Sequence, residues 1–93
     1  MSPVRDVKTP NPLTSAQIRA ARALIRWSAE DLARESTVST TSIRRAELKP
    51  SETKLTRVND QAIRRTLEKA GVEFIDADGG GPGVRLKEEK KAG

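Results

Sequence analysis

The sequence predicts a small, mainly α-helical domain in which four helices are followed by a short β segment. Its length of 93 residues suits a single domain. Residues 13–71 repeat apolar side chains at helical spacing between capping residues, whereas residues 72–87 alternate in the manner of strands. Residues 1–12 hold three of the five prolines and show neither pattern, so we expect a flexible N-terminal arm. The tail, residues 88–93, is expected to fray.

The first helix is predicted to begin after Thr14 and to end near Arg26. Thr14 and Gln17 have the types and spacing of a capping box, in which each side chain accepts a hydrogen bond from the other residue's backbone N–H. Leu13 precedes this cap at the spacing of a hydrophobic staple to Ile18. The expected apolar stripe of the helix consists of Ile18, Ala21, Leu24 and Ile25.

Two short helices are predicted next. Ser28 is expected to cap a helix over residues 29–35, with Asp31 in its first turn, where negative charge suits the helix dipole. Ser39 is expected to cap a helix over residues 40–48. The residues expected to face inward are Leu32, Ala33, Val38, Ile43, Ala46 and Leu48.

A fourth helix is predicted over residues 60–70, after a polar connection. Asn59 is its expected cap, and Val58 and Ile63 again have the spacing of a hydrophobic staple. Gly71 is expected to end the helix in a left-handed conformation, which costs glycine little.

Residues 72–87 contain two strand-like runs around the Gly-rich segment "ADGGGPG". A hairpin is the simplest interpretation, and it would place Glu73 opposite Arg85. A two-stranded ribbon is not stable alone, so it must pack on its own helices or pair with a second subunit. The side chains expected to serve dimerisation are Val72, Phe74, Ile75, Val84 and Leu86.

The composition excludes several classes of site. The chain has no Cys and no His, which excludes disulfides, Cys/His zinc sites and Cys–His or Ser–His catalytic pairs. We therefore expect no enzyme activity, no metal, no cofactor and no small-molecule ligand. No apolar run approaches the ~18 residues of a membrane span, and we expect a cytoplasmic protein. The 18 Lys and Arg outnumber the 13 Asp and Glu, a net charge of +5 that favours polyanionic partners.

Residues 29–47 meet the requirements of a helix-turn-helix. Small and apolar residues stand where the two helices would cross, and Val38 can fill the turn between them. Arginine can donate two hydrogen bonds to guanine, and threonine can contact a base edge or the thymine methyl group. The outward residues expected to contact bases are Thr40, Thr41, Arg44 and Arg45.

Contacts to a phosphate backbone are expected from helix starts and from basic side chains of the first helix. The candidates are Ser28, Ser39, Arg19, Arg22 and Arg26. The three arginines have an alternative interpretation as a solvated face. The segment "GGGPG" lacks the Lys-Ser/Thr pair of a phosphate-binding loop, so a hairpin loop is the better interpretation.

The segments "SAEDLARESTVSTTSIRRAE" and "AIRRTLEKAGVEF" resemble the Cro/repressor-type (XRE-like) helix-turn-helix family of bacterial and phage transcription regulators. The stretch "GVEFID…GGGPGVRL" is similar to a bacterial subgroup, so the resemblance covers about residues 13–87. It implies a four-helix, repressor-like DNA-binding domain over residues 13–71. By family position, Thr40, Thr41 and Arg45 match the main base-contacting sites. The resemblance implies that Arg44 contacts a phosphate or a neighbouring base. Thr37 stands where the family usually has Gly, so either a strained backbone or a differently built turn is predicted there.

The resemblance implies a sequence-specific transcriptional regulator, expected to act as a repressor and as a homodimer on a short inverted-repeat operator. Its expected partners are double-stranded DNA and a second copy of the chain. The alternative is a protein-interaction module, such as an antitoxin or an anti-activator, that holds another protein through the β segment and Phe74. Binding to a protein partner without binding to DNA would favour this alternative.

Overall fold

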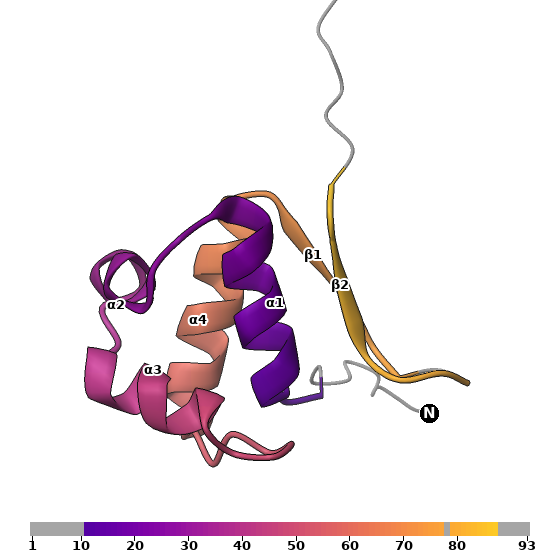
Figure 1. Ribbon diagram of the computed structural model, residues 1–93, viewed down its shortest axis with the longest axis horizontal. Coiled ribbons are helices and arrows are strands. Elements are labelled where there is room, and N and C mark those ends of the chain that lie inside the picture. Colours follow the sequence, from indigo (N-terminus) through magenta and orange to yellow (C-terminus); the bar gives the residue numbers. More distant parts are fainter. Residues whose placement is uncertain (1–10, 78, 88–93) are drawn as a thin grey trace, which may run out of the picture.

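The computed structural model describes residues 11–77 and 79–87, which form four helices and a two-stranded antiparallel sheet (Figure 1). The mainly helical domain with a C-terminal hairpin is therefore confirmed. The predictions for residues 1–10 and for the tail lie outside the described residues. None of the helices formed by the described residues has the length and apolar character needed to cross a membrane. The elements are α1 (Ser15–Ile25), α2 (Ala29–Ser36), α3 (Thr40–Glu47), α4 (Arg57–Lys69), β1 (Val72–Ile75) and β2 (Gly83–Leu86).

The first two helices begin at complete capping boxes. The Thr14 hydroxyl accepts from the Gln17 N–H at 3.1 Å, and the Gln17 side-chain oxygen accepts from the Thr14 N–H at 2.9 Å. The Ser28 hydroxyl accepts from the Asp31 N–H at 3.0 Å, and the Asp31 carboxylate accepts from the Ser28 N–H at 2.9 Å. These bonds satisfy N–H groups that have no partner inside the helix, so the predicted starts of α1 and α2 are confirmed.

The start of α4 differs from the prediction. Thr56 is the cap, its hydroxyl accepting from the Asn59 N–H at 3.1 Å, and Asn59 lies inside the first turn. Val58 forms no staple to Ile63, because it lies on the outer side of the helix with 74% of its surface exposed. Thr56 and Asn59 are both capping types three residues apart, and the earlier start adds a turn of helix while Ile63 still faces inward.

The core lies between the helices and the inner face of the hairpin. Its buried members are Leu13, Ile18, Ala21, Ala29, Leu32, Val38, Ile43, Ile63, Leu67 and Val72. Two residues predicted to face inward do not. Leu24 is exposed, because Ile18, Ala21 and Ile25 already occupy the core-facing stripe of α1. Leu48 is 83% exposed, because it caps the end of α3 where the chain turns away.

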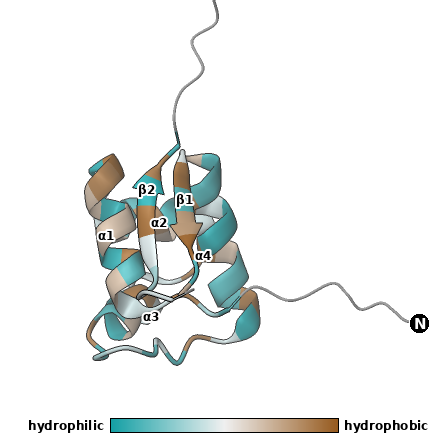
Figure 2. Cartoon of the chain, turned by 90° about the vertical axis from the view of Figure 1, so that its right-hand side faces the viewer, coloured by the Kyte–Doolittle hydropathy of each residue, from teal (hydrophilic) through white to brown (hydrophobic). Residues whose placement is uncertain are grey.

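Helices α1 and α4 lie between the α2–α3 pair on one side and the hairpin on the other (Figure 1). Strand β2 packs on α1 and strand β1 on α4 (Figure 2). The predicted pairing of Glu73 with Arg85 is confirmed, with an ion pair at 3.1 Å across the strands. The hairpin is therefore formed within the chain and shares the core of the helices.

Gln17 attaches the hairpin to α1. Besides its role in the capping box, its side-chain NH2 group donates to the backbone oxygens of Ile75 at 3.3 Å and Gly83 at 3.1 Å. The side chain is buried, so water replaces none of these bonds. Gln17 thus provides hydrogen-bond partners for backbone groups at the start of α1 and at the loop end of both strands.

Candidate nucleic-acid interface

Helices α2 and α3 pack against each other across a three-residue turn. Thr37 ends α2 with φ 61° and ψ 20°, the left-handed conformation that a β-branched residue rarely adopts. The strain predicted at this position therefore has a structural basis. Val38 follows and is buried, and its N–H donates to the Ser36 hydroxyl at 3.2 Å. The buried valine and this bond hold the turn in place.

Helix α3 is buried on one side and open on the other. Ile43 and Ala46 are buried, as predicted, and they anchor the helix to the core. Thr41, Arg44 and Arg45 are exposed, and Thr40 is half-buried at the first turn. The structure thus brings the four predicted base-contacting residues to one accessible helix, at the edge of the molecule away from the hairpin (Figure 1).

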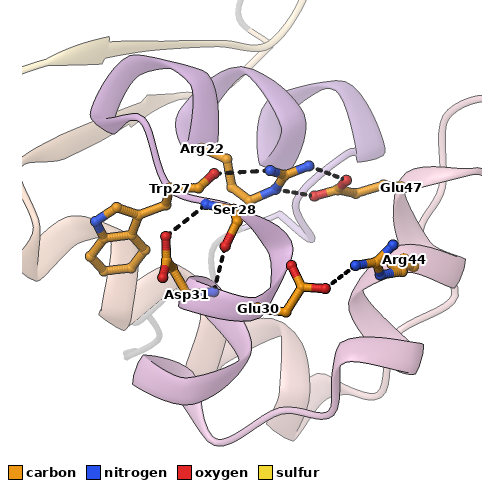
Figure 3. A network of polar contacts seen from close by, with 7 residues as sticks. All are labelled: Arg22, Trp27, Ser28, Glu30, Asp31, Arg44 and Glu47. Atoms are coloured by element: carbon orange, nitrogen blue, oxygen red, sulfur yellow. Dashed lines mark hydrogen bonds and ion pairs between the residues drawn. The ribbon is translucent and has the colours of Figure 1, made fainter.

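Arg44 pairs with Glu30 of α2 through its Nη2 atom (Figure 3). Both side chains remain more than half exposed, at 57% and 58%. The pKa of the Glu30 carboxyl is lowered, first by a hydrogen bond from its own backbone N–H and then by the charge of Arg44. The Glu30 carboxyl is therefore charged at neutral pH.

Arg45 lines a cleft of about 310 Å³ between α3 and the start of α4. The cleft also contains Lys49 and Lys54, and no carboxylate lines it. Within residues 11–77 and 79–87, Arg45 forms no ion pair, whereas Lys54 pairs weakly with exposed Glu52 at 3.4 Å. Neither lysine was predicted as a site residue from the sequence. Both lie in a connection without periodicity, and only the fold brings them into the same cleft as Arg45. The remaining lining residues are Ser42, Ala46, Thr53, Leu55, Thr56 and Asn59.

Arg22, one of the predicted phosphate contacts, is held by partners within its own chain. Its guanidinium donates to both carboxylate oxygens of Glu47, at 2.7 and 2.8 Å, and to the backbone oxygen of Trp27 at 2.9 Å (Figure 3). The hydrogen bonds with Glu47 raise the pKa of Arg22. Arg22 therefore ties α1 to α3 and to the chain that leads into α2.

The other predicted phosphate contacts keep at least part of their surface accessible. Arg19 and Arg26 are exposed on α1 and form no ion pair with any other described residue. The hydroxyl oxygens of Ser28 and Ser39 accept the capping hydrogen bonds of α2 and α3. The roles of these four residues at a phosphate backbone stay predictions.

The predicted dimerisation residues fall into three groups. Val72 is fully buried in its own core, so its side chain cannot contact a partner and this assignment is wrong. Phe74 and Val84 are half-buried against the same core, and Phe74 also packs under the guanidinium of Arg64, 5.2 Å from the ring centre. Ile75 and Leu86 are exposed and remain available.

The part of the chain that the structure describes contains no cluster of three acidic residues that could hold a metal ion. Comparison of the sequence with models of known protein families gives no match, and comparison with curated proteins gives none either.

Proposed function

We propose that the protein is a sequence-specific DNA-binding transcriptional regulator in which α2 and α3 form a helix-turn-helix and α3 reads base edges. The observation that carries the proposal is the open face of α3, where Thr41, Arg44 and Arg45 stand opposite the buried Ile43 and Ala46. The major groove of DNA is wide enough for a helix, and arginine and threonine are among the side chains that distinguish its base pairs.

The basic cleft beside α3 supports this proposal. Phosphate contacts position a protein on DNA, whereas base contacts specify the sequence. Lys49 and Lys54 lie in the same cleft as Arg45, so one surface offers a base-reading arginine together with two cations for the adjoining backbone. The net charge of +5 also attracts the negatively charged DNA backbone, at longer range than the cleft does.

The ion pair between Arg22 and Glu47 holds α3 in the fixed position that recognition of base edges requires. Side chains that recognise a ligand must be held close to their productive geometry by residues that are themselves fixed. Arg22 fixes Glu47 at the C-terminal end of α3 from α1, while Val38 and Ile43 fix its N-terminal half in the core. The orientation of α3 therefore depends on this ion pair together with the core.

We further propose that the protein acts as a homodimer on an inverted repeat and represses by occupying the operator. A helix of eight residues reaches few base pairs, and two copies related by a two-fold axis would meet successive major grooves about 34 Å apart. Ile75 and Leu86 are exposed apolar side chains on opposite faces of the hairpin, and a partner subunit would cover one of them. Size-exclusion chromatography with light scattering tests this, and a monomer at micromolar concentration that binds a single half-site would contradict it.

Fluorescence anisotropy tests the DNA-binding proposal. The probes are a duplex from the region upstream of the protein's own gene, a duplex selected from a random pool on the protein, and a scrambled duplex. The wild-type protein should prefer the first or the second over the third. Arg45→Ala should reduce this preference by about 1–3 kcal/mol. Arg65→Ala is the matched control, because it removes the same charge from an exposed position on α4.

Two results would overturn the assignment. If Arg45→Ala discriminated among the duplexes as well as the wild type, α3 would not be the reading element. If no duplex bound, the exposed Ile75 and Leu86 would instead support a protein-interaction module that uses the hairpin. Substitution of both residues by Ser should then abolish capture of the protein partner.

A further inference from the structure

We infer that Glu30 determines DNA specificity by holding Arg44. Held in this way, Arg44 can bind a base edge of the operator but is kept from binding the phosphates of other DNA. This inference rests on the proposed function and concerns how its reading surface is controlled. Glu30 is a positioning residue in this scheme, since it acts through Arg44 and does not contact a base itself.

The contact joins the two helices at the surface that would meet DNA. Glu30 lies in the first turn of α2, two residues after the Ser28 cap, and its Oε2 atom accepts from Nη2 of Arg44 in the middle of α3 (Figure 3). The other ion pairs of α2, which join Arg34 to Asp31 and to Glu35, stay within that helix. Among the described residues, Glu30 is therefore the carboxylate through which α2 restrains α3.

The chemistry of the guanidinium allows one partner to be kept while another is bound. Arginine has five N–H donors in a rigid plane, and the contact with Glu30 uses the Nη2 end. The structure gives Nε and Nη1 of Arg44 no hydrogen-bond partner among the described residues. Arg44 can therefore donate to a base edge without leaving Glu30, and the carboxylate restricts the directions from which it donates.

Most non-operator sites present no suitable base edge to an Arg44 that Glu30 restrains. Arg44 would then gain only by turning toward a phosphate, and this would leave the Glu30 carboxylate unpaired beside a negatively charged backbone. The ion pair thus opposes binding to arbitrary sequences more than it opposes binding to the operator. Both side chains are more than half exposed, so the pair adds little to folding and its effect belongs to binding.

Glu30→Gln tests the inference, because it removes the charge and keeps the shape of the side chain. Affinity for the scrambled duplex should rise, and the slope of log affinity against log salt should steepen by about 0.9, the value for one additional phosphate. Between about 200 and about 50 mM salt, this slope makes the advantage of Glu30→Gln over the wild type grow about 3.5-fold. Affinity for the selected operator should change much less, so the specificity ratio falls.

Two controls separate this mechanism from a general loss of negative charge. Glu35→Gln removes an exposed carboxylate from the same helix, one that pairs with Arg34 and with no other cation of the described residues. It should leave the scrambled-duplex affinity close to that of the wild type. In an Arg44→Ala background, Glu30→Gln should no longer steepen the salt dependence for the scrambled duplex, since the residue that would reach the additional phosphate is gone. An undiminished effect in that background would overturn the inference.

The outcomes also separate this inference from the proposed function. If the wild type prefers the operator but Glu30→Gln behaves like Glu35→Gln, the inference alone is wrong. If the wild type binds the operator and the scrambled duplex equally, sequence-specific recognition is wrong and the inference fails with it. Circular dichroism of each variant verifies that the helices are retained.

Discussion

Replacement of Arg22 by Met should destabilise the fold strongly, although Arg22 looks like a surface arginine in the sequence. Methionine keeps the apolar stem of the side chain and removes the guanidinium. The variant loses two hydrogen bonds to Glu47, at 2.7 and 2.8 Å, and one to the Trp27 carbonyl at 2.9 Å. It also leaves Glu47, whose side chain is only 10% exposed, without its cation.

The expected loss is about 3 kcal/mol of unfolding free energy. Removing one partner of a buried ion pair costs roughly 3–5 kcal/mol, because the remaining charge is left uncompensated. The Arg22 side chain is 22% exposed, so water compensates part of this cost and the lower end of that range applies. Domains of this size are stable by roughly 5–15 kcal/mol and lose about 4–8 °C of Tm per kcal/mol, so Tm should fall by roughly 12–24 °C.

Urea denaturation followed by far-UV circular dichroism and by the fluorescence of Trp27 measures the loss. A cycle with Glu47→Leu should show strong coupling, because the double variant buries no unpaired charge and should be more stable than the two single losses would predict. Arg34→Met is the matched control, since the side chain of that arginine is 64% exposed and its replacement should cost far less stability than Arg22→Met. A loss from Arg22→Met as small as that of the control, or additive losses in the cycle, would refute the reasoning.

Three further variants test other parts of the fold. Gln17→Glu should lower the free energy of unfolding by about 2 kcal/mol and speed amide hydrogen exchange in the hairpin, because it replaces the buried NH2 donor by a carboxylate facing two carbonyls. Unchanged exchange in the hairpin would contradict this. Thr37→Gly should stabilise the protein by about 1 kcal/mol in urea denaturation, because relief of the left-handed strain outweighs the added freedom of the unfolded chain; a loss of stability would show that the turn is unstrained. Asp60→Asn should keep the bond from the Leu13 N–H and stabilise the protein at pH 7, because burial raises the pKa of Asp60 and disfavours its charged form. A raised folded pKa means that protonation stabilises the wild type as pH falls through that pKa, so the advantage of Asn should shrink in acid; an advantage independent of pH would exclude this cause.

Local patterns in the sequence predict most of the secondary structure. A capping bond joins residues three positions apart, so Thr14, Ser28 and Ser39 mark the starts of α1, α2 and α3 without reference to the rest of the chain. The start of α4 was predicted wrongly because Thr56 and Asn59 are both suitable caps in one polar stretch, and nothing local chooses between them.

The sequence by itself also determines which face of α3 is open. Ile43 and Ala46 leave only one side of a short helix for the core, so Thr41, Arg44 and Arg45 must face outward whatever the arrangement of the other helices. The alternation of residues 72–75 and 83–86 similarly places Glu73 opposite Arg85 once a hairpin forms. These features depend on the periodicity of a single element.

Only the tertiary structure decides what each polar side chain does. Arg19, Arg22 and Arg26 are alike in type and lie on α1 or directly after it, but among them it is Arg22 that bonds Glu47, which lies 25 residues away in the chain. The pairing of Glu30 with Arg44 and the approach of Lys54 to Arg45 likewise join separate elements. The range of an ion pair or a hydrogen bond is a few ångströms, so the partner is set by how the helices pack and not by the spacing of residues along one of them.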